Sequence, residues 1–305
     1  METGTGKVKA LDQIQYPDND PLGRWDKRWG PGRQIIRPEY RTRTVPPPDK
    51  KPLGPSADQK ADQNATSLVW SGCVAFRETQ AASINSVEAV WVVPNCYPPK
   101  DAVDGQWYTC SSWIGIDGDA NAKDGSIDIL QVGVDSDVMQ YAGVVTRWVS
   151  AWWEWLPGVS QWIPVFPISP GDTLDVVVAM KKGSKTEATI YLHNRTSGAA
   201  TSFPVTAPAG TELIGNCAEW IVEKTNLPGT ASREFASYGA VCFEQAKAYT
   251  DKEDILLPSE KSCRLYRMVD DKKQIISQPE VGSDLVRCFY KGPTPTDILM
   301  PSFIK

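Results

Sequence analysis

The sequence predicts an all-β protein, an antiparallel sandwich or barrel preceded by an irregular, proline-rich N-terminal extension. From Leu68 onward, short apolar runs of strand-forming residues are separated by Gly, Pro, Asn and Asp. No amphipathic helix of more than two turns is recognisable, and no repeat of fixed period appears. Four of the apolar runs have one fully apolar side, which is typical of strands that cover a common core.

The first 66 residues differ in composition from the rest of the chain. They hold nine of the 24 prolines, including Pro46-Pro47-Pro48, and 12 basic against 9 acidic residues, whereas the remainder holds 20 basic and 28 acidic residues. Such a segment buries little apolar surface, so we expect it to be extended or disordered in isolation. The stretch Gly23–Gly30 is different, because its two tryptophans need a surface to lie on. Two interpretations stay open: a flexible tail, or a basic pro-segment that docks on an acidic body.

Residues 67–291 form the predicted β-body, and residues 292–305 form an irregular tail. The predicted strands are Val69–Phe76, Ser86–Val93, Trp107–Ile116, Ile127–Val134, Met139–Trp155, Thr173–Met180, Ala188–Leu192, Ala218–Glu223, Phe235–Phe243, Arg264–Val269 and Leu285–Tyr290. Between them, pairs such as Pro157-Gly158 and Lys182-Gly183 predict turns.

Composition and charge argue against several classes of protein. A net charge of −5 argues against a general nucleic-acid binder. No run of about 18 apolar residues exists, so no transmembrane helix is expected. The N-terminus has no apolar segment of the kind found in secretory signals. Twelve tryptophans predict either an aromatic core or an aromatic-lined groove.

Histidine and cysteine usage restricts the possible chemistry. The only histidine, His193, lies where a predicted strand runs into a turn, and no Gly-x-Ser-x-Gly or His-Glu-x-x-His motif is present. Seven cysteines leave at least one thiol unpaired within the chain, and none is spaced Cys-x-x-Cys, so a zinc ribbon or redox site is not expected. If the protein is an enzyme, carboxylates or amides are the expected catalytic groups.

The non-apolar sides of four strands share an unusual composition. They carry Trp, Gly, Gln, Asp and Glu but no Lys or Arg, which describes a ligand groove better than a solvated rim. The residues are Trp113, Gly115 and Asp117; Ile129, Gln131, Gly133 and Asp135; Trp152 and Glu154; and Glu219, Ile221 and Glu223. The alternative is that these are scattered outward residues on unrelated strands.

The same strands resemble the glutamic peptidases, the eqolisin family. The resemblance covers roughly Leu68 to Tyr290, and its motifs occur in the family's order. The matching stretches are Trp70–Gly72, Val90–Pro94, Trp113–Asp119, Leu130–Asp135, Ala151–Pro157, Gly171-Asp172, Ala218–Glu223 and Phe235–Gly239. The resemblance implies a concanavalin-like β-sandwich of two large antiparallel sheets. It also implies an acid-acting endopeptidase that is secreted as a precursor with a removable N-terminal segment.

The family's catalytic glutamine falls on Gln131 and its catalytic glutamate on Glu219. We expect Glu219 to activate water as a general base while Gln131 stabilises the oxyanion, without metal or cofactor. Five further residues match positions that line the family's cleft: Trp70, Trp113, Asp117, Trp152 and Glu154. Polypeptides are the expected partners, and we expect a monomer that binds neither nucleic acid nor membrane.

The chain departs from the family pattern outside the catalytic pair. Leu156 stands where the family usually has Tyr, which removes a hydroxyl that could bind substrate. Ser150 replaces a polar residue that is often Asp, Val69 replaces an Asn, and Ala120 and Asn121 stand where fungal members carry a cysteine.

Two alternative functions remain open from the sequence. A carbohydrate-binding β-sandwich would also use tryptophans and acids on a sheet face, and a glycosidase would pair Glu219 with Glu154 or Asp117 across about 5 to 10 Å. The other alternative is a catalytically inactive peptidase homologue with a binding role. Gln131 separates the first of these from a peptidase, because a glycosidase needs a second carboxylate in place of the amide.

Overall fold

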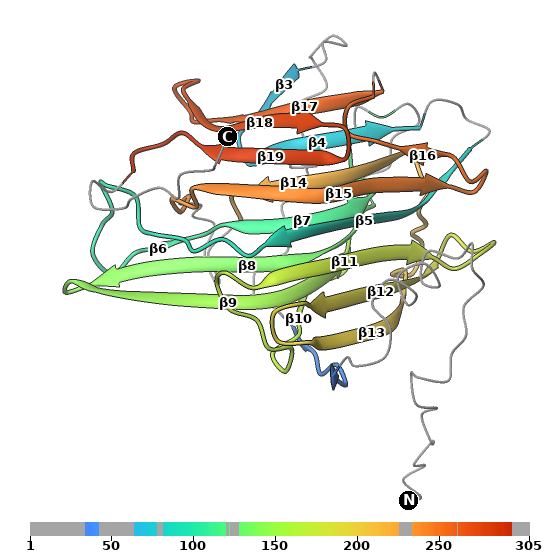
Figure 1. The fold of residues 1–305 in the computed structure, drawn as a ribbon, viewed down its shortest axis with the longest axis horizontal. Coiled ribbons are helices and arrows are strands. Elements are labelled where there is room, and N and C mark those ends of the chain that lie inside the picture. The colour runs from blue at the N-terminus through green and yellow to red at the C-terminus, as the bar shows by residue number, and fades with distance from the viewer. Residues whose placement is uncertain are drawn as a thin grey trace, which may run out of the picture.

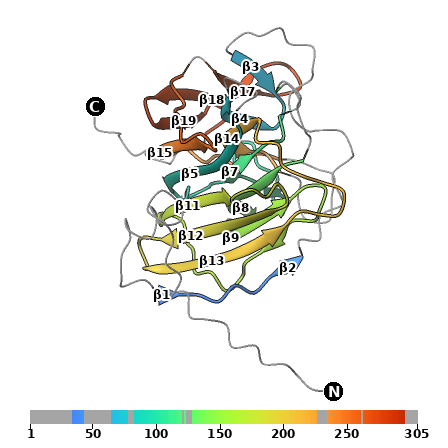
Figure 2. The same ribbon diagram turned by 90° about the vertical axis from the view of Figure 1, so that its right-hand side faces the viewer.

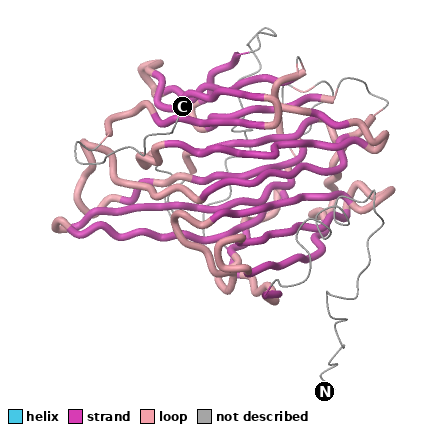
Figure 3. The backbone as a smooth tube through the Cα atoms, in the orientation of Figure 1, coloured by secondary structure: helices cyan, strands magenta, loops and turns pink. Residues whose placement is uncertain are grey.

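The computed structural model describes residues 34–42, 64–77, 82–119, 122, 128–225, 234–260 and 262–294. These residues form nineteen strands and no helix (Figure 3). The prediction of an all-β fold is therefore confirmed. The described part of the chain contains no helix long and apolar enough to cross a membrane.

Backbone pairing arranges the strands in two layers, which we call the site layer and the back layer (Figure 1). The site layer runs from edge to edge through β3 (Asn64–Ser67), β17 (Cys263–Val269), β4 (Trp70–Phe76), β14 (Cys217–Glu223), β7 (Ser111–Ile116), β8 (Leu130–Tyr141), β9 (Val144–Trp155), β10 (Gln161–Trp162) and β2 (Arg41–Thr42), and β6 (Trp107–Tyr108) also pairs with β8.

The back layer is built in the same way. It runs through β18 (Ile275–Gly282), β19 (Leu285–Tyr290), β15 (Ala240–Thr250), β5 (Ile84–Val92), β11 (Thr173–Met180), β12 (Glu187–Asn194), β13 (Ala199–Thr206) and β1 (Gln34–Ile35), and β16 (Ile255–Leu256) also pairs with β15. The β1–β13 and β3–β17 pairs are parallel, and the others are antiparallel. Pairing of β17 with β18 joins the two layers at one edge.

The layers pack face to face as an antiparallel β-sandwich, which confirms the predicted fold class. Strands β5 and β11 of the back layer lie over β7, β8 and β14 of the site layer (Figure 2). The core between them contains the apolar sides predicted from alternation, including Trp220 from β14, Ile114 from β7 and Val132 from β8. Fully buried Trp91 from β5 faces them from the back layer. Because each strand gives one side to this core, its other side is available for a site.

One predicted strand is wrong in its extent. The stretch Met139–Trp155, predicted as a single strand, is the end of β8, a turn at Ala142 and Gly143, and then β9. Both turn residues have positive φ, 49° and 79°, as a two-residue hairpin loop requires. Alanine is a rare residue at such a position, so composition gives no turn signal here.

A second predicted strand is shifted, and several strands were not predicted. The predicted strand Phe235–Phe243 begins at Ala240 and continues to Thr250, with a register shift at Gln245, whose φ is 52°. Strands β13 and β18 have no counterpart in the sequence prediction, nor do the short strands β1, β2, β3, β10 and β16. The short ones are held by pairing at sheet edges rather than by an apolar pattern of their own.

Part of the N-terminal extension lies on the body. Strand β1 pairs with β13 at the edge of the back layer, and β2 pairs with β10 at the edge of the site layer. Between them, Tyr40 stacks edge-on against Trp153 and Phe203, with ring centroids 6.1 and 5.3 Å apart. Residues 1–33 and 43–63 lie outside the described residues, so the predicted character of the whole extension stays a prediction.

Candidate active site

Strand register places the predicted catalytic pair in one row across the site layer. Glu219 on β14 lies opposite Gly115 on β7, Gly115 lies opposite Gln131 on β8, and Gln131 lies opposite Glu154 on β9. Neighbouring strands are about 4.8 Å apart, so the backbones of Glu219 and Gln131 are about 10 Å apart. Gly115 lies between them and has no side chain. The side chains of Glu219 and Gln131 can therefore occupy the space above it.

Glu219 is fully buried on the outward side of β14. The Cys217 thiol lies 3.8 Å from its Oε1, while its Oε2 has no hydrogen-bond partner among the described residues. Burial raises the pKa of the Glu219 carboxyl well above its ordinary value, and the nearby Asp119 and Asp117 raise it further. An unpartnered oxygen on a buried acid is costly in free energy, and such groups are concentrated at functional sites.

Gln131 is held by its neighbour in the same row. Its Nε2 donates a hydrogen bond of 2.7 Å to Oε2 of Glu154, and its Oε1 has no partner among the described residues. The amide nitrogen has a second N–H, which this bond does not use. Glu154 therefore fixes the orientation of the amide and leaves one donor and one acceptor for other groups.

The next row along the same face is aromatic. Ile221 on β14 lies opposite Trp113 on β7, followed by Gly133 on β8 and Trp152 on β9. Trp70 from β4 packs edge-on against Trp113, with ring centroids 5.4 Å apart. The structure thus brings Trp70, Trp113 and Trp152 together in one buried cluster, beside the row that contains Glu219 and Gln131.

The indole nitrogens of two of these tryptophans are bonded within the face. Trp113 Nε1 donates to Oε2 of Glu223 at 2.9 Å, and Trp152 Nε1 donates to Oγ of Ser111 at 3.0 Å. These bonds fix the ring planes, so the tryptophans form a rigid wall. Glu223 accepts the bond from Trp113 on the same side of β14 as Glu219.

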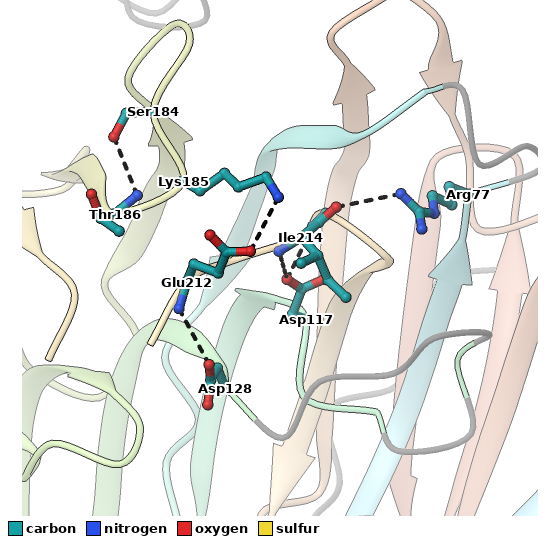
Figure 4. Close-up of polar contacts among 9 residues, drawn as sticks. Arg77, Asp117, Asp128, Ser184, Lys185, Thr186, Glu212 and Ile214 are labelled. Carbon is teal, nitrogen blue, oxygen red and sulfur yellow. Dashed lines mark hydrogen bonds and ion pairs between the residues drawn. The ribbon is translucent and has the colours of Figure 1, made fainter. Parts of the chain in front are cut away.

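Asp117 is fully buried and holds a loop in place. Its carboxylate accepts a hydrogen bond of 2.7 Å from the backbone N–H of Ile214 (Figure 4). It also accepts hydrogen bonds from the backbone N–H groups of Gly215, at 3.0 Å, and of Asn216. Its backbone adopts φ of 62° as β7 ends, and this turns the side chain toward the segment that leads into β14. Burial raises the pKa of Asp117, and the backbone hydrogen bonds act in the opposite direction. Asp117 therefore positions the strand that carries Glu219.

Two residues near Glu219, Asp119 and Tyr266, were not predicted from the sequence as part of the site. Asp119 is fully buried and accepts a hydrogen bond from the Tyr266 hydroxyl. Burial, and next the charge of Asp119, raise the pKa of Tyr266. Asp119 was within the matched stretch Trp113–Asp119, but nothing in that stretch distinguished it. Tyr266 comes from β17, far away in sequence, and only pairing of β17 with β4 brings it here.

The face predicted to line an open groove is closed to solvent. Glu219 is 0% exposed, Gln131 is 6% exposed and Trp113 is 0% exposed. Within the described residues, no group of three or more His, Cys, Asp or Glu is arranged to hold a metal ion. The arrangement brings together one buried carboxylate, Glu219, and one oriented amide, Gln131.

Comparisons with known proteins match this part of the chain. A family model described as the Peptidase A4 family matches residues 68–290. Aspergillopepsin-2 of Aspergillus niger is 29% identical over 191 residues, which are 63% of this chain and 62% of that protein. Scytalidopepsin B of Scytalidium lignicola is 27% identical over 227 residues, which are 72% of this chain and 77% of that protein.

Two solved structures are also similar. The crystal structure of scytalido-glutamic peptidase with a peptide-based transition state analogue has a TM-score of 0.57 at 24% identity, and the match covers 73% of this chain and 98% of that one. The crystal structure of aspergilloglutamic peptidase from Aspergillus niger has a TM-score of 0.51 at 29% identity, covering 60% of this chain and 99% of that one. These scores show a shared fold.

Proposed function

This chain belongs to the Peptidase A4 family, the glutamic peptidases, and from that premise we propose that it hydrolyses peptide bonds in polypeptides. The proposal assigns the chemistry to Glu219 and Gln131. The observation that carries it is their common row, with Gly115 between them and an unbonded oxygen on each side chain. Polypeptides are then the substrates, and no other reactant than water is required.

In the proposed mechanism, ionised Glu219 takes a proton from a water molecule that attacks the scissile carbonyl carbon. The free N–H of the Gln131 amide donates a hydrogen bond to the oxygen that becomes negative. Protonated Glu219 then gives its proton to the departing amine nitrogen. Glu154 supports this sequence because it holds the Gln131 nitrogen at 2.7 Å and so fixes the amide plane.

The closed face suggests how the reaction depends on pH. In the closed form, burial and the neighbouring Asp119 keep Glu219 protonated to higher pH than an ordinary glutamate. Access of water to the site lowers that pKa toward the ordinary range, near ~4.3, so an open form works in mild acid. We propose that the described form is closed to substrate and that residues 1–66 are a pro-segment of a secreted enzyme.

A digestion assay with matched variants tests the assignment. Full-length protein is incubated with a denatured protein at pH 3 to 5 and at pH 7, and new amino termini are counted. We expect Glu219→Gln to lose activity by about a thousandfold or more and Gln131→Ala by about a hundredfold or more. Glu187→Gln, on β12 of the back layer at a glutamate whose side chain is 47% exposed, is the control and should retain activity within a few-fold. Full acid proteolysis by Glu219→Gln would show that the assignment is wrong.

The same assay tests the pro-segment. If residues 1–66 hold the enzyme inactive, activity at acid pH should appear after a lag, together with shortening of the chain from its N-terminus. Immediate full activity of the intact chain would refute the pro-segment proposal without affecting the catalytic pair. Absence of activity after shortening would favour the inactive-homologue alternative.

The glycosidase alternative fits the contacts less well. Such an enzyme needs a second carboxylate beside Glu219. Glu154 accepts a hydrogen bond from Gln131, and Asp117 accepts three from backbone N–H groups. Both carboxylates are therefore occupied in holding the site together.

A further inference from the structure

The outer surface of the back layer has an unexpected degree of burial. Strands β5, β11, β12 and β13 lie side by side there (Figure 2). Because side chains alternate along a strand, every second residue points away from the core. We call six of these residues the back face: Glu88, Asp175, Val177, Tyr191, His193 and Ala200. All six are at most 6% exposed, although they belong to the outside of a two-layer sandwich. Three of them, with Ala179, form an apolar cluster separate from the core.

The described strands do not account for this burial. Strands β11, β12 and β13 pack mainly against their neighbours in the back layer and, for β11, against β7 and β8 on the core side. An outer sheet face left to water alternates with polar, exposed residues, and here the outward residues include Val177 at 0% and Ala200 at 1% exposure. Packing among the described strands therefore does not explain why the back face is buried.

The chain enters the described structure at the edge of this face. Gln34 pairs with Ala199, and the backbone N–H of Ile36 donates to the carbonyl of Ala200 at 2.6 Å. The 33 residues that precede Gln34 thus arrive beside β13. After Gln34 the chain crosses to the other layer, where β2 pairs with β10. Gln34, the first described residue, therefore lies at the β13 edge of the back layer.

Length and chemistry both fit the segment before Gln34. Trp29 and Trp25 lie five and nine residues before Gln34. At about 3.3 Å per residue they reach about 16 and 30 Å, whereas the face from β13 to β5 is only about 14 Å wide. Their rings match the apolar cluster. The neighbouring Arg24, Lys27 and Arg28 are opposite in charge to Glu88 and Asp175. Glu88 also accepts a hydrogen bond from the Tyr249 hydroxyl, and Asp175 pairs with Arg195, each at 3.0 Å.

We propose that the back face is the docking surface for residues 1–33, with Trp25 and Trp29 as the anchors. This surface lies on the opposite side of the sandwich from Glu219. The first part of the extension then acts on the active site only through the body, and does not cover it. The proposal holds or fails independently of the catalytic assignment, because it concerns neither Glu219 nor Gln131.

The only histidine of the chain reports on the back face directly. His193 is 6% exposed, so diethyl pyrocarbonate, which modifies imidazole, should label the intact protein slowly. We expect the double variant Trp25→Ala/Trp29→Ala to be labelled at least tenfold faster. The control is Trp148→Ala, which removes a tryptophan that is 41% exposed on β9 and should leave the labelling rate unchanged. Unchanged protection in the folded double variant overturns the proposal.

Cross-linking of the unaltered full-length chain gives a second readout that does not depend on any variant folding. Lys247 on β15 lies opposite Glu88, beside the back face, whereas Lys224 follows β14 beside the active site. A short amine-reactive cross-linker should join Lys27 to Lys247. Cross-links from Lys27 to Lys224 in their place would put the segment over the active site and overturn the proposal.

Discussion

At the scale of single residues, Glu219 is placed at a cost to stability. Its carboxyl is fully buried, one oxygen lacks a partner, and the charges of Asp119 and Asp117 act against its ionisation. A core position selected only for packing would hold an apolar residue of the same size. A buried carboxyl with a raised pKa is a candidate functional group, and this agrees with the role proposed for Glu219.

This placement has a consequence for stability. Because folding raises the pKa of Glu219 above its ordinary value of about 4.5, the folded state binds the proton more tightly than the unfolded chain does. The contribution of the protonated Glu219 carboxyl to stability is fully present below the ordinary glutamate pKa of about 4.5. It is lost as the pH rises through the higher pKa of the folded state. We expect the urea midpoint to fall as pH rises above the ordinary pKa of a glutamate, and Glu219→Gln to reduce this fall. Equal pH dependence in both proteins would contradict the expectation.

Asp117 is the second informative residue. Its carboxylate replaces water for three backbone N–H groups that precede β14, and hydrogen bonds to charged groups contribute about 1.5 to 3 kcal/mol each. We expect Asp117→Ala to lower the free energy of unfolding by about 3 kcal/mol or more, measured by urea denaturation. Asp128→Ala is the control, because the N–H of Glu212 lies 3.3 Å from its carboxylate on the exposed side of the same region (Figure 4). That change should cost less than about 1 kcal/mol, and similar losses in both variants would argue against the loop-holding role.

At the scale of strands, register determines the site. Alternation along each strand predicted which side chains share a face, and this holds for β7, β8, β9 and β14. Register across the strands then puts Gly115 beside Glu219 and Gln131, while Gly133 lies between Trp113 and Trp152. The sequence alone does not distinguish the two glycines, but their neighbours on the adjacent strands differ.

Alanine substitutions should separate the two glycines. A Cβ on Gly115 would lie 3.1 Å from the Leu130 carbonyl oxygen and 3.2 Å from the Trp113 ring, a contact that small shifts relieve. A Cβ on Gly133 would lie 2.3 Å from the Ser112 carbonyl oxygen, where backbone must move. We expect Gly115→Ala to lower kcat/KM about tenfold with a stability loss near ~1 kcal/mol, and Gly133→Ala to cost about 3 kcal/mol or more. Proteolysis assays measure kcat/KM, and thermal unfolding measures stability. A larger loss of kcat/KM in Gly133→Ala and a larger loss of stability in Gly115→Ala would contradict the proposed roles of Glu219 and Gln131.

At the scale of the whole molecule, residues 34–42 join the free edges of the two layers. Pairing of β17 with β18 links the layers on one side of the sandwich, and β1 and β2 link them on the other through pairing with β13 and β10. Each layer thereby ends on this side in a two-residue strand, and short edge strands limit unwanted edge-to-edge association. The segment is part of the fold as well as of the N-terminal extension.

Tyr40 is the side chain that fastens this segment. Its ring meets Trp153 of the site layer and Phe203 of the back layer. Aromatic pairs contribute about 0.5 to 1.5 kcal/mol each beyond buried area, so the loss of two pairs in Tyr40→Ala should lower Tm by about 2 to 12 °C. Tyr141→Ala, at a 63% exposed position, is the matched control and should leave Tm nearly unchanged. Equal shifts in the two variants would show that Tyr40 does not fasten the layers.

The sequence by itself determined the strand-rich fold, the apolar side of each major strand and, through matching motifs, Glu219 and Gln131 as candidates. These depend on alternation within single strands and on local motifs, which need no knowledge of neighbours. The hairpin at Ala142, the role of Asp119 with Tyr266 and the burial of both sheet faces were decided only by the tertiary structure. They depend on which strands pair and in which register, and this is set by the packing of segments far apart in the chain.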